Sequence, residues 1–109
     1  MARLLLMQKT GSPKQVELSG ERTLIGRATT SDILIDHPRV SRHHAEVRVE
    51  DGSVWLIDLA SSNGTLVNGH RVKQCALNHG DVIRIGDCNI RVLTRHTSFP
   101  LPKELSLAD

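Results

Sequence analysis

Aromatic side chains are scarce in this 109-residue sequence, which contains Trp55, Phe99 and no tyrosine. Proteins that stack the bases of single-stranded nucleic acid need several exposed rings, so the composition argues against that class of binding. The core must instead be built from aliphatic side chains. Such a core is feasible, because the hydrophobic class makes up 39% of the residues. A chain of this length corresponds to one domain.

Cysteine and long apolar runs are also scarce. Cys75 and Cys88 form no CxxC pair, which excludes zinc-ribbon and thioredoxin-type sites. We expect two reduced thiols, as in a cytosolic protein, although the sequence leaves a disulfide between them open. The apolar run at residues 4–7 is too short for a signal-peptide core, and no run approaches the roughly 20 residues that span a bilayer. These absences predict a cytoplasmic protein without a membrane partner.

Neither sign of charge dominates the sequence. It has 14 Lys and Arg residues against 12 Asp and Glu residues, for a formal net charge of +2. Any positive site must therefore arise from the local placement of a few cations, because a bulk basic field is missing. The six histidines lack the spacing of metal ligands, so we expect no metal and no cofactor.

Short β-type runs separated by turns dominate what is present. Asp51-Gly52 and Asn68-Gly69 each separate two such runs, which is the preferred turn sequence of a β-hairpin. No segment carries a convincing helical period. About ten runs are recognisable, at residues 3–8, 15–18, 23–25, 33–35, 45–50, 54–58, 65–67, 71–72, 81–85 and 89–93. The pattern predicts an all-β sandwich of two sheets over residues 1–94, with the loops gathered at its ends.

The last residues, 95–109, lose this pattern and hold Pro100 and Pro102. We expect a C-terminal tail or the start of a linker there. The alternative is that Phe99 and Leu101 pack back against the edge of the sandwich.

Three polar loops carry side chains unlike the rest of the chain. Residues 26–32 contain Arg27, residues 38–44 contain two arginines and two histidines without a carboxylate, and residues 60–65 contain serine, asparagine and glycine. Guanidinium, hydroxyl and amide groups donate hydrogen bonds, and the fork of arginine matches two phosphate oxygens. Gly64 would let the backbone take a positive φ. Brought together at one end of a sandwich, these loops would suit a small dianion.

Four separated blocks of the sequence resemble the signature of the forkhead-associated (FHA) domain family. They are Gly26-Arg27, Ser41-Arg42-His43-His44, Ser62-Asn63-Gly64-Thr65 with Asn68-Gly69, and Asp81-Val82-Ile83-Arg84-Ile85-Gly86. Their order and separation agree with the family over about residues 3–93. The resemblance implies a β-sandwich of about eleven strands that binds phosphothreonine in partner proteins in signalling, with no catalysis.

The resemblance also implies a role for individual residues. Asn63 would bond the peptide main chain, and Arg39 would read the side chain three residues after the phosphothreonine, where an acidic residue would be favoured. The phosphate would be held by Arg27, Ser41, Arg42 and Ser62. The positions that shape the loops would be Gly26, His44, Gly64 and Asn68. The partner would be a phosphothreonine-containing protein or peptide, and the chain itself would be a monomer or a module of a larger protein.

Two other readings start from the same residues. A nucleic-acid-binding β domain could use Arg27, Arg39 and Arg42 as phosphate contacts, although the near-neutral charge and the missing rings disfavour it. A hydrolase could be drawn from Ser41, His44 and Asp58. No G-x-S-x-G elbow is present to support that reading.

Overall fold

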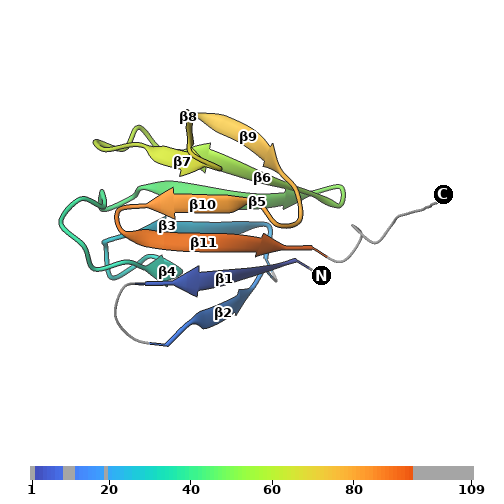
Figure 1. The fold of residues 1–109 in the computed structure, drawn as a ribbon, viewed down its shortest axis with the longest axis horizontal. Coiled ribbons are helices and arrows are strands. Elements are labelled where there is room, and N and C mark those ends of the chain that lie inside the picture. The colour runs from blue at the N-terminus through green and yellow to red at the C-terminus, as the bar shows by residue number, and fades with distance from the viewer. Residues whose placement is uncertain (1, 9–11, 19, 95–109) are drawn as a thin grey trace.

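The computed structural model describes residues 2–8, 12–18 and 20–94, and the predicted tail at 95–109 lies outside them. Strands are the only regular elements of the described part of the chain (Figure 1). They are β1 (Arg3–Met7), β2 (Lys14–Glu17), β3 (Arg22–Gly26), β4 (Ile33–Leu34), β5 (Ala45–Glu50), β6 (Ser53–Asp58), β7 (Thr65–Val67), β8 (His70–Val72), β9 (Gln74–Leu77), β10 (Val82–Ile85) and β11 (Cys88–Leu93). The all-β prediction is therefore confirmed.

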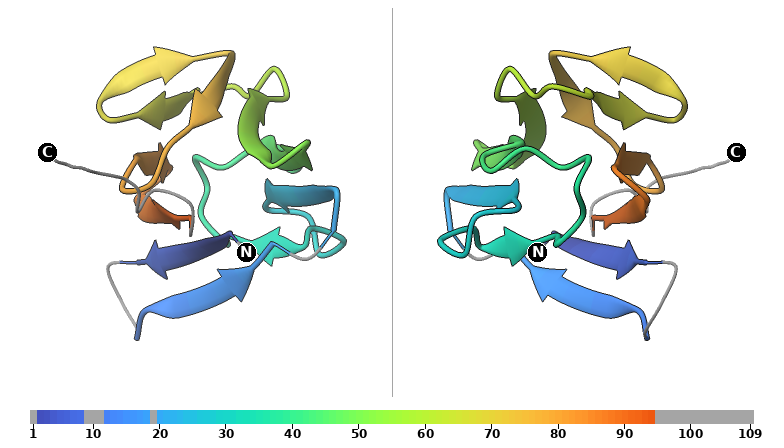
Figure 2. Two further views of the ribbon diagram at one scale, coloured as in Figure 1. Left: turned by 90° about the vertical axis from the view of Figure 1, so that its right-hand side faces the viewer. Right: turned by 90° about the vertical axis from the view of Figure 1, so that its left-hand side faces the viewer.

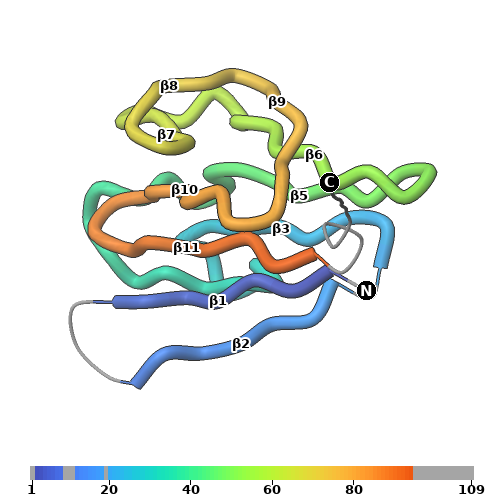
Figure 3. The backbone as a smooth tube through the Cα atoms, turned by 45° about the vertical axis from the view of Figure 1, so that its right-hand side comes forward, coloured from blue at the N-terminus to red at the C-terminus, as the bar shows by residue number. Residues whose placement is uncertain are grey.

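The strands form two sheets that face each other as layers (Figure 2). One sheet has six strands in the order β2-β1-β11-β10-β7-β8, and the other has five in the order β4-β3-β5-β6-β9. All pairings are antiparallel except that of β3 with β4. The chain crosses between the sheets from β8 to β9 at one edge of the sandwich (Figure 3).

Tight turns fix the register of the hairpins. Asp51 and Gly52 join β5 to β6 with φ values of 51° and 79°, and Asn68 and Gly69 join β7 to β8 with 51° and 86°. Two consecutive positive φ angles are the mark of a type I′ turn, whose twist matches that of the flanking strands. Both hairpins predicted from these dipeptides are therefore present.

An aliphatic core fills the space between the sheets. Alternate residues of each strand point inward, as the period of two requires, and each fully buried large side chain contributes about 1.5–3 kcal/mol. The largest apolar side chains with less than 2% exposure are Leu4, Ile25, Ile35, Val40, Val47, Leu56, Ile83, Ile85, Ile90 and Val92. Cys75 and Cys88 are free thiols, which answers the question that the sequence left open. Burial raises the pKa of both thiols.

Two local features were not predicted from the sequence. Strand β9 was not predicted, because its residues include none of the β-branched or aromatic side chains that favour strands. It forms by pairing with β6 at the edge of the five-stranded sheet. The second feature is Glu46 of β5, a charged residue that is only 6% exposed. Arg48 donates its Nε–H to Glu46 at 2.6 Å and Arg22 lies 3.7 Å away, so two guanidinium groups cover the carboxylate.

The first and last described strands lie side by side. β1 pairs with β11 antiparallel, with Arg3 opposite Leu93. The free ends of both strands therefore lie at the end of the sandwich away from the loop after Gly26 (Figure 1). Within the residues that the structure describes, no helix is long and apolar enough to span a bilayer.

Candidate functional site

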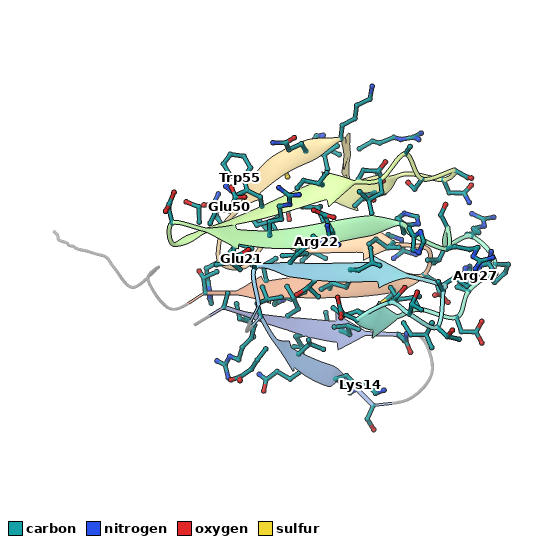
Figure 4. All side chains as sticks on the ribbon, turned by 180° about the vertical axis from the view of Figure 1, so that it is seen from behind. Lys14, Glu21, Arg22, Arg27, Glu50 and Trp55 are labelled. Atoms are coloured by element: carbon teal, nitrogen blue, oxygen red, sulfur yellow. The ribbon has the colours of Figure 1, made fainter. Side chains whose placement is uncertain are left out.

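Three loops meet at one end of the sandwich. They follow β3 (residues 27–32), precede β5 (residues 35–44) and follow β6 (residues 59–64). Backbone hydrogen bonds join the first two, from Arg27 N–H to Ser41 O at 3.0 Å and from Ala28 N–H to Arg42 O at 3.1 Å. Arg27 projects from this end, far from Glu50 and Trp55 at the other (Figure 4). The predicted loop residues are thus brought to one rim.

Gly26 allows this close approach of two backbones. A Cβ atom built on Gly26 would lie 2.0 Å from the carbonyl oxygen of Arg42 and 2.8 Å from its carbon. No side chain fits there without moving the backbone. The absence of a side chain at Gly26 therefore sets the distance between the loop of Arg27 and the loop of Ser41.

Arg27 is exposed, but its side chain is held at its base. Its Nε–H donates to Val40 O at 2.9 Å. Among the described residues, the terminal Nη groups have no hydrogen-bond partner and no carboxylate forms an ion pair with them. These are the paired donors that fit two oxygens of one phosphate. The guanidinium is thus positioned by the protein while its fork stays available.

Ser41 connects the second loop to the third. Its Oγ accepts a hydrogen bond from Ser62 N–H at 3.1 Å. A serine hydroxyl has one donor and two acceptor positions, so the Oγ–H of Ser41 remains free to donate to a ligand. Ser62 itself is exposed. The two serines therefore lie within one hydrogen bond of each other.

His44 joins the second loop to the third from the buried side of the rim. It is fully buried. Its Nδ1 accepts from Ser41 N–H at 3.0 Å, and its Nε2 lies 2.9 Å from Gly64 O. An acceptor at Nδ1 and a carbonyl at Nε2 require the neutral tautomer with the proton on Nε2. The ring thus fixes the positions of Ser41 and Gly64, which are 23 residues apart in sequence.

This arrangement rules out the hydrolase drawn from Ser41, His44 and Asp58. His44 bonds the backbone N–H of Ser41 and not its hydroxyl, and its second nitrogen is occupied by Gly64. Asp58 bonds other residues altogether. In the described part of the chain, no three His, Cys, Asp or Glu residues are grouped as a metal site.

Asp58 organises the third loop, a role that no sequence motif indicated. Its carboxylate accepts from Ser61 Oγ at 2.5 Å, Thr65 Oγ1 at 2.6 Å and Ser61 N–H at 3.1 Å. Ser61 Oγ in turn accepts from Gly64 N–H at 3.0 Å. Burial acts to raise the pKa of Asp58, but the hydrogen bonds from Ser61 and Thr65 outweigh it, and the pKa is lowered. The ionised carboxylate therefore stabilises the loop.

We expect Asp58→Asn to lower the free energy of unfolding near neutral pH by about 1 kcal/mol, because an amide oxygen replaces only some of the bonds and part of the group faces solvent. A lowered folded-state pKa gives stability that is present above the unfolded value of about 3.9 and is lost as the pH falls through the folded value. Urea unfolding at pH 7 and below pH 4 should show the difference between the two proteins shrinking in acid. A constant difference would contradict this role of Asp58.

Asn63 and Arg39 lie at the outer edge of the same rim. Asn63 donates from Nδ2 to the carbonyl of Arg39 at 2.8 Å, which links the second and third loops. The amide oxygen and second N–H of Asn63 have no partner among the described residues. Arg39 and Arg42 are exposed, so their guanidinium groups reach solvent beside the loops.

Gly64 takes a φ of +88°, in agreement with the prediction from the sequence. Its N–H is occupied by Ser61, so it does not point at a ligand. A Cβ on Gly64 would lie 2.6 Å from Nε of Arg71, a contact that no motif indicated. Asn68 shapes the hairpin turn, and its side chain bonds Asp81 and Val82 N–H.

Known proteins are similar to this chain in sequence. A family model described as FHA domain matches residues 23–86. The glycogen accumulation regulator GarA of Mycolicibacterium smegmatis is 37% identical over 93 residues, which cover 85% of this chain and 59% of the relative. The chain therefore spans less than two thirds of that relative's length.

Two solved structures are similar in fold and sequence. The first is the FhaA FHA domain complexed with the intracellular domain of Rv3910, with a TM-score of 0.78 and 36% identity over 84% of this chain and 99% of the other. The second comes from a study of phosphothreonine-dependent FHA domain interactions, with a TM-score of 0.76 and 34% identity over 86% and 96%. Together with the match over residues 23–86, these likenesses show that the chain belongs to the FHA domain family.

Proposed function

We propose that this chain is a non-catalytic module that binds phosphothreonine-containing segments of partner proteins. The observation that carries the proposal is the rim itself. Arg27 is tethered through Nε with its fork available, and Ser41 lies beside Ser62 with a free hydroxyl proton. The FHA domains of similar fold that are described as binding a partner or as phosphothreonine-dependent give independent support.

The charge of the ligand accounts for the residue types of the rim. Phosphothreonine carries about −1.5 to −2 charge near pH 7 and three acceptor oxygens. Arg27 would supply the paired donors, and Ser41, Arg42 and Ser62 would supply the remaining contacts. Each charge-assisted hydrogen bond contributes roughly 1.5–3 kcal/mol. Because ordering a flexible peptide opposes several such bonds, we expect a dissociation constant on the order of micromolar.

The peptide around the phosphothreonine would contact the outer edge of the rim. The free oxygen and N–H of the Asn63 amide can pair with one peptide unit of an extended main chain. The guanidinium of Arg39 has no partner among the described residues and would attract an acidic side chain of the ligand. Gly26, His44, Gly64 and Asn68 would act only by holding the loops.

A titration tests the proposal. We expect a phosphothreonine peptide with an acidic residue three positions on to bind, and the same peptide without phosphate to show no measurable binding. Affinity should fall with rising salt, because the rim is exposed, and below about pH 6, because the phosphate then loses charge. Isothermal calorimetry measures all three effects. Equal binding of the unphosphorylated peptide would defeat the proposal.

A DNA oligomer of matched charge is the control for the alternative reading. The residues that the structure describes add no basic helix or aromatic platform to the rim, so we expect the oligomer to bind far more weakly than the phosphopeptide. We further propose a cytoplasmic setting, where free thiols such as Cys75 and Cys88 stay reduced.

A further inference from the structure

The outer face of the six-stranded sheet carries arginines between half-buried aliphatic side chains. Because alternate residues share a face, the residues between the buried ones point outward. The aliphatic members are Leu5, Met7, Leu66, Val82 and Leu93, and the arginines are Arg3, Arg71, Arg84 and Arg91. All four arginines are exposed.

Strand register places Arg71 and Arg84 in the row of this face nearest the loops, with Arg91 in the next row and Arg3 in the last. Arg71 lies opposite Leu66, and Leu66 lies opposite Arg84, so the two arginines are two strand spacings apart, roughly 10 Å. Arg91 lies opposite Val82, diagonal to Arg84 on the next strand, a separation of about 7–8 Å. We call Arg71, Arg84 and Arg91 the arginine strip.

Within the described residues, no carboxylate forms an ion pair with the strip. Glu17 is the one acidic strand residue of this face, and it lies opposite Arg3 in the row farthest from the loops. In the neighbouring turns, Asp81 is bonded by Asn68 and Asn78, and Asp87 lies 3.7 Å from His37.

The arginines on the outer face of the five-stranded sheet are paired with carboxylates. There Arg22 and Arg48 face Glu46 and Glu50 at 2.6–3.7 Å. The two outer faces thus differ in charge although the chain as a whole is nearly neutral. Among the described residues of the two sheets, guanidinium groups without a carboxylate partner lie on the six-stranded sheet.

The strip begins at the candidate binding rim. Nε of Arg71 lies 2.6 Å from the position that a Cβ on Gly64 would occupy, and Gly64 follows Asn63 directly. Thr65, the first residue of β7, follows Gly64. Along this face from Asn63, Arg71 therefore comes first, followed by Arg84 and then Arg91.

We propose that the arginine strip binds an acidic segment of the same phosphorylated partner, outside its phosphothreonine. This inference rests on the proposed function, because the phosphothreonine anchors the segment. Each guanidinium can pair with one carboxylate through two parallel hydrogen bonds, and the aliphatic side chains between them give the segment a surface to lie on. Continuity with the rim favours a peptide over a lipid surface or a nucleic acid.

Extended peptides test the proposal. A phosphothreonine peptide that binds this protein is lengthened with a short run of glutamates. The run is placed at the amino end in one version and at the carboxyl end in another. Matched peptides carry glutamines instead. At low salt, we expect one glutamate peptide to bind about three- to tenfold more tightly than its glutamine counterpart, as exposed ion pairs allow.

Variants locate the effect. Arg84→Gln with Arg91→Gln should remove the gain from the glutamates and leave the affinity of the unextended peptide unchanged. Arg3→Gln on the same face and Arg22→Gln on the other sheet are the matched controls and should keep the gain. The inference fails if neither glutamate peptide gains affinity, if the gain survives the double variant, or if the controls lose it equally.

Two further outcomes separate this inference from the proposed function and from other partners. If the unextended phosphopeptide does not bind, the proposed function itself fails. A different result overturns the inference while the proposed function stands: the unextended phosphopeptide binds, but the glutamates add no affinity. If anionic vesicles or DNA then bind the unaltered protein and do not bind the double variant, the arginine strip serves a different partner.

Discussion

Replacing Arg27 with alanine is expected to weaken phosphothreonine-peptide binding by roughly 30- to 100-fold, the equivalent of about 2–3 kcal/mol. Its fork is the one bidentate donor that the structure tethers beside Ser41, through the bond from Nε to Val40 O. Stability should change little, by at most about 1 kcal/mol, because the side chain is exposed and makes a single bond. Calorimetric titration and urea unfolding measure the two effects separately.

Two variants sharpen this test. Arg27→Lys keeps the charge but loses the fork and the donor to Val40, so its affinity should fall between those of the alanine variant and the unaltered protein. Arg22→Ala removes an arginine from the opposite end of β3 and should leave affinity unchanged. If Arg27→Ala binds within about threefold of the unaltered protein, the assignment of Arg27 to the phosphate is wrong.

Replacing Gly26 with alanine is expected to cost about 3 kcal/mol of stability or more, at the upper end of what overpacking causes. The new methyl group would lie 2.0 Å from the carbonyl oxygen of Arg42. Backbone must move to relieve that contact, which breaks the bonds from Arg27 and Ala28 to the second loop. For a domain of this size, the loss corresponds to a fall in Tm of about 12–24 °C.

Gly20→Ala is the matched control for this change. A Cβ on Gly20 would meet its nearest neighbour only at 3.9 Å, so the same substitution should leave Tm nearly unchanged. Phosphopeptide affinity of the folded Gly26→Ala protein should fall as well, because the loops of Arg27 and Ser41 separate. If the Gly26→Ala protein were as stable as the Gly20→Ala protein, the close contact with Arg42 would not determine the stability of this region.

The sequence was informative where a local pattern dictates the structure. Asp51-Gly52 and Asn68-Gly69 gave both hairpins, because few residue pairs accept two consecutive positive φ angles. Strand β9 escaped prediction, since Gln74 and Ala76 become a strand only by pairing with β6. The burial of Glu46 escaped it for a similar reason, as Arg22 and Arg48 cover the carboxylate from neighbouring strands.

The candidate site shows the same division. Its loop residues were identified by their resemblance to the FHA family. Positions that shape the loops were identified in the same way, but the contacts that hold the third loop were not, because no motif indicates them. The network around Asp58 links positions up to seven residues away, and the contact of Arg71 with Gly64 depends on the β7–β8 turn. The sequence shows that Thr65 has a hydroxyl group able to bond a carboxylate, but it does not show which carboxylate.

The pairing of β1 with β11 has a practical consequence for how the module can be attached. Both strand ends, near Arg3 and Leu93, emerge together on the side remote from Arg27 (Figure 4). A fusion, tether or sensor-chip linkage made at either end would therefore hold the sandwich by its base and present its ligand-facing rim to the surroundings. If several copies are joined in tandem through these ends, the rim of each copy stays accessible to a ligand.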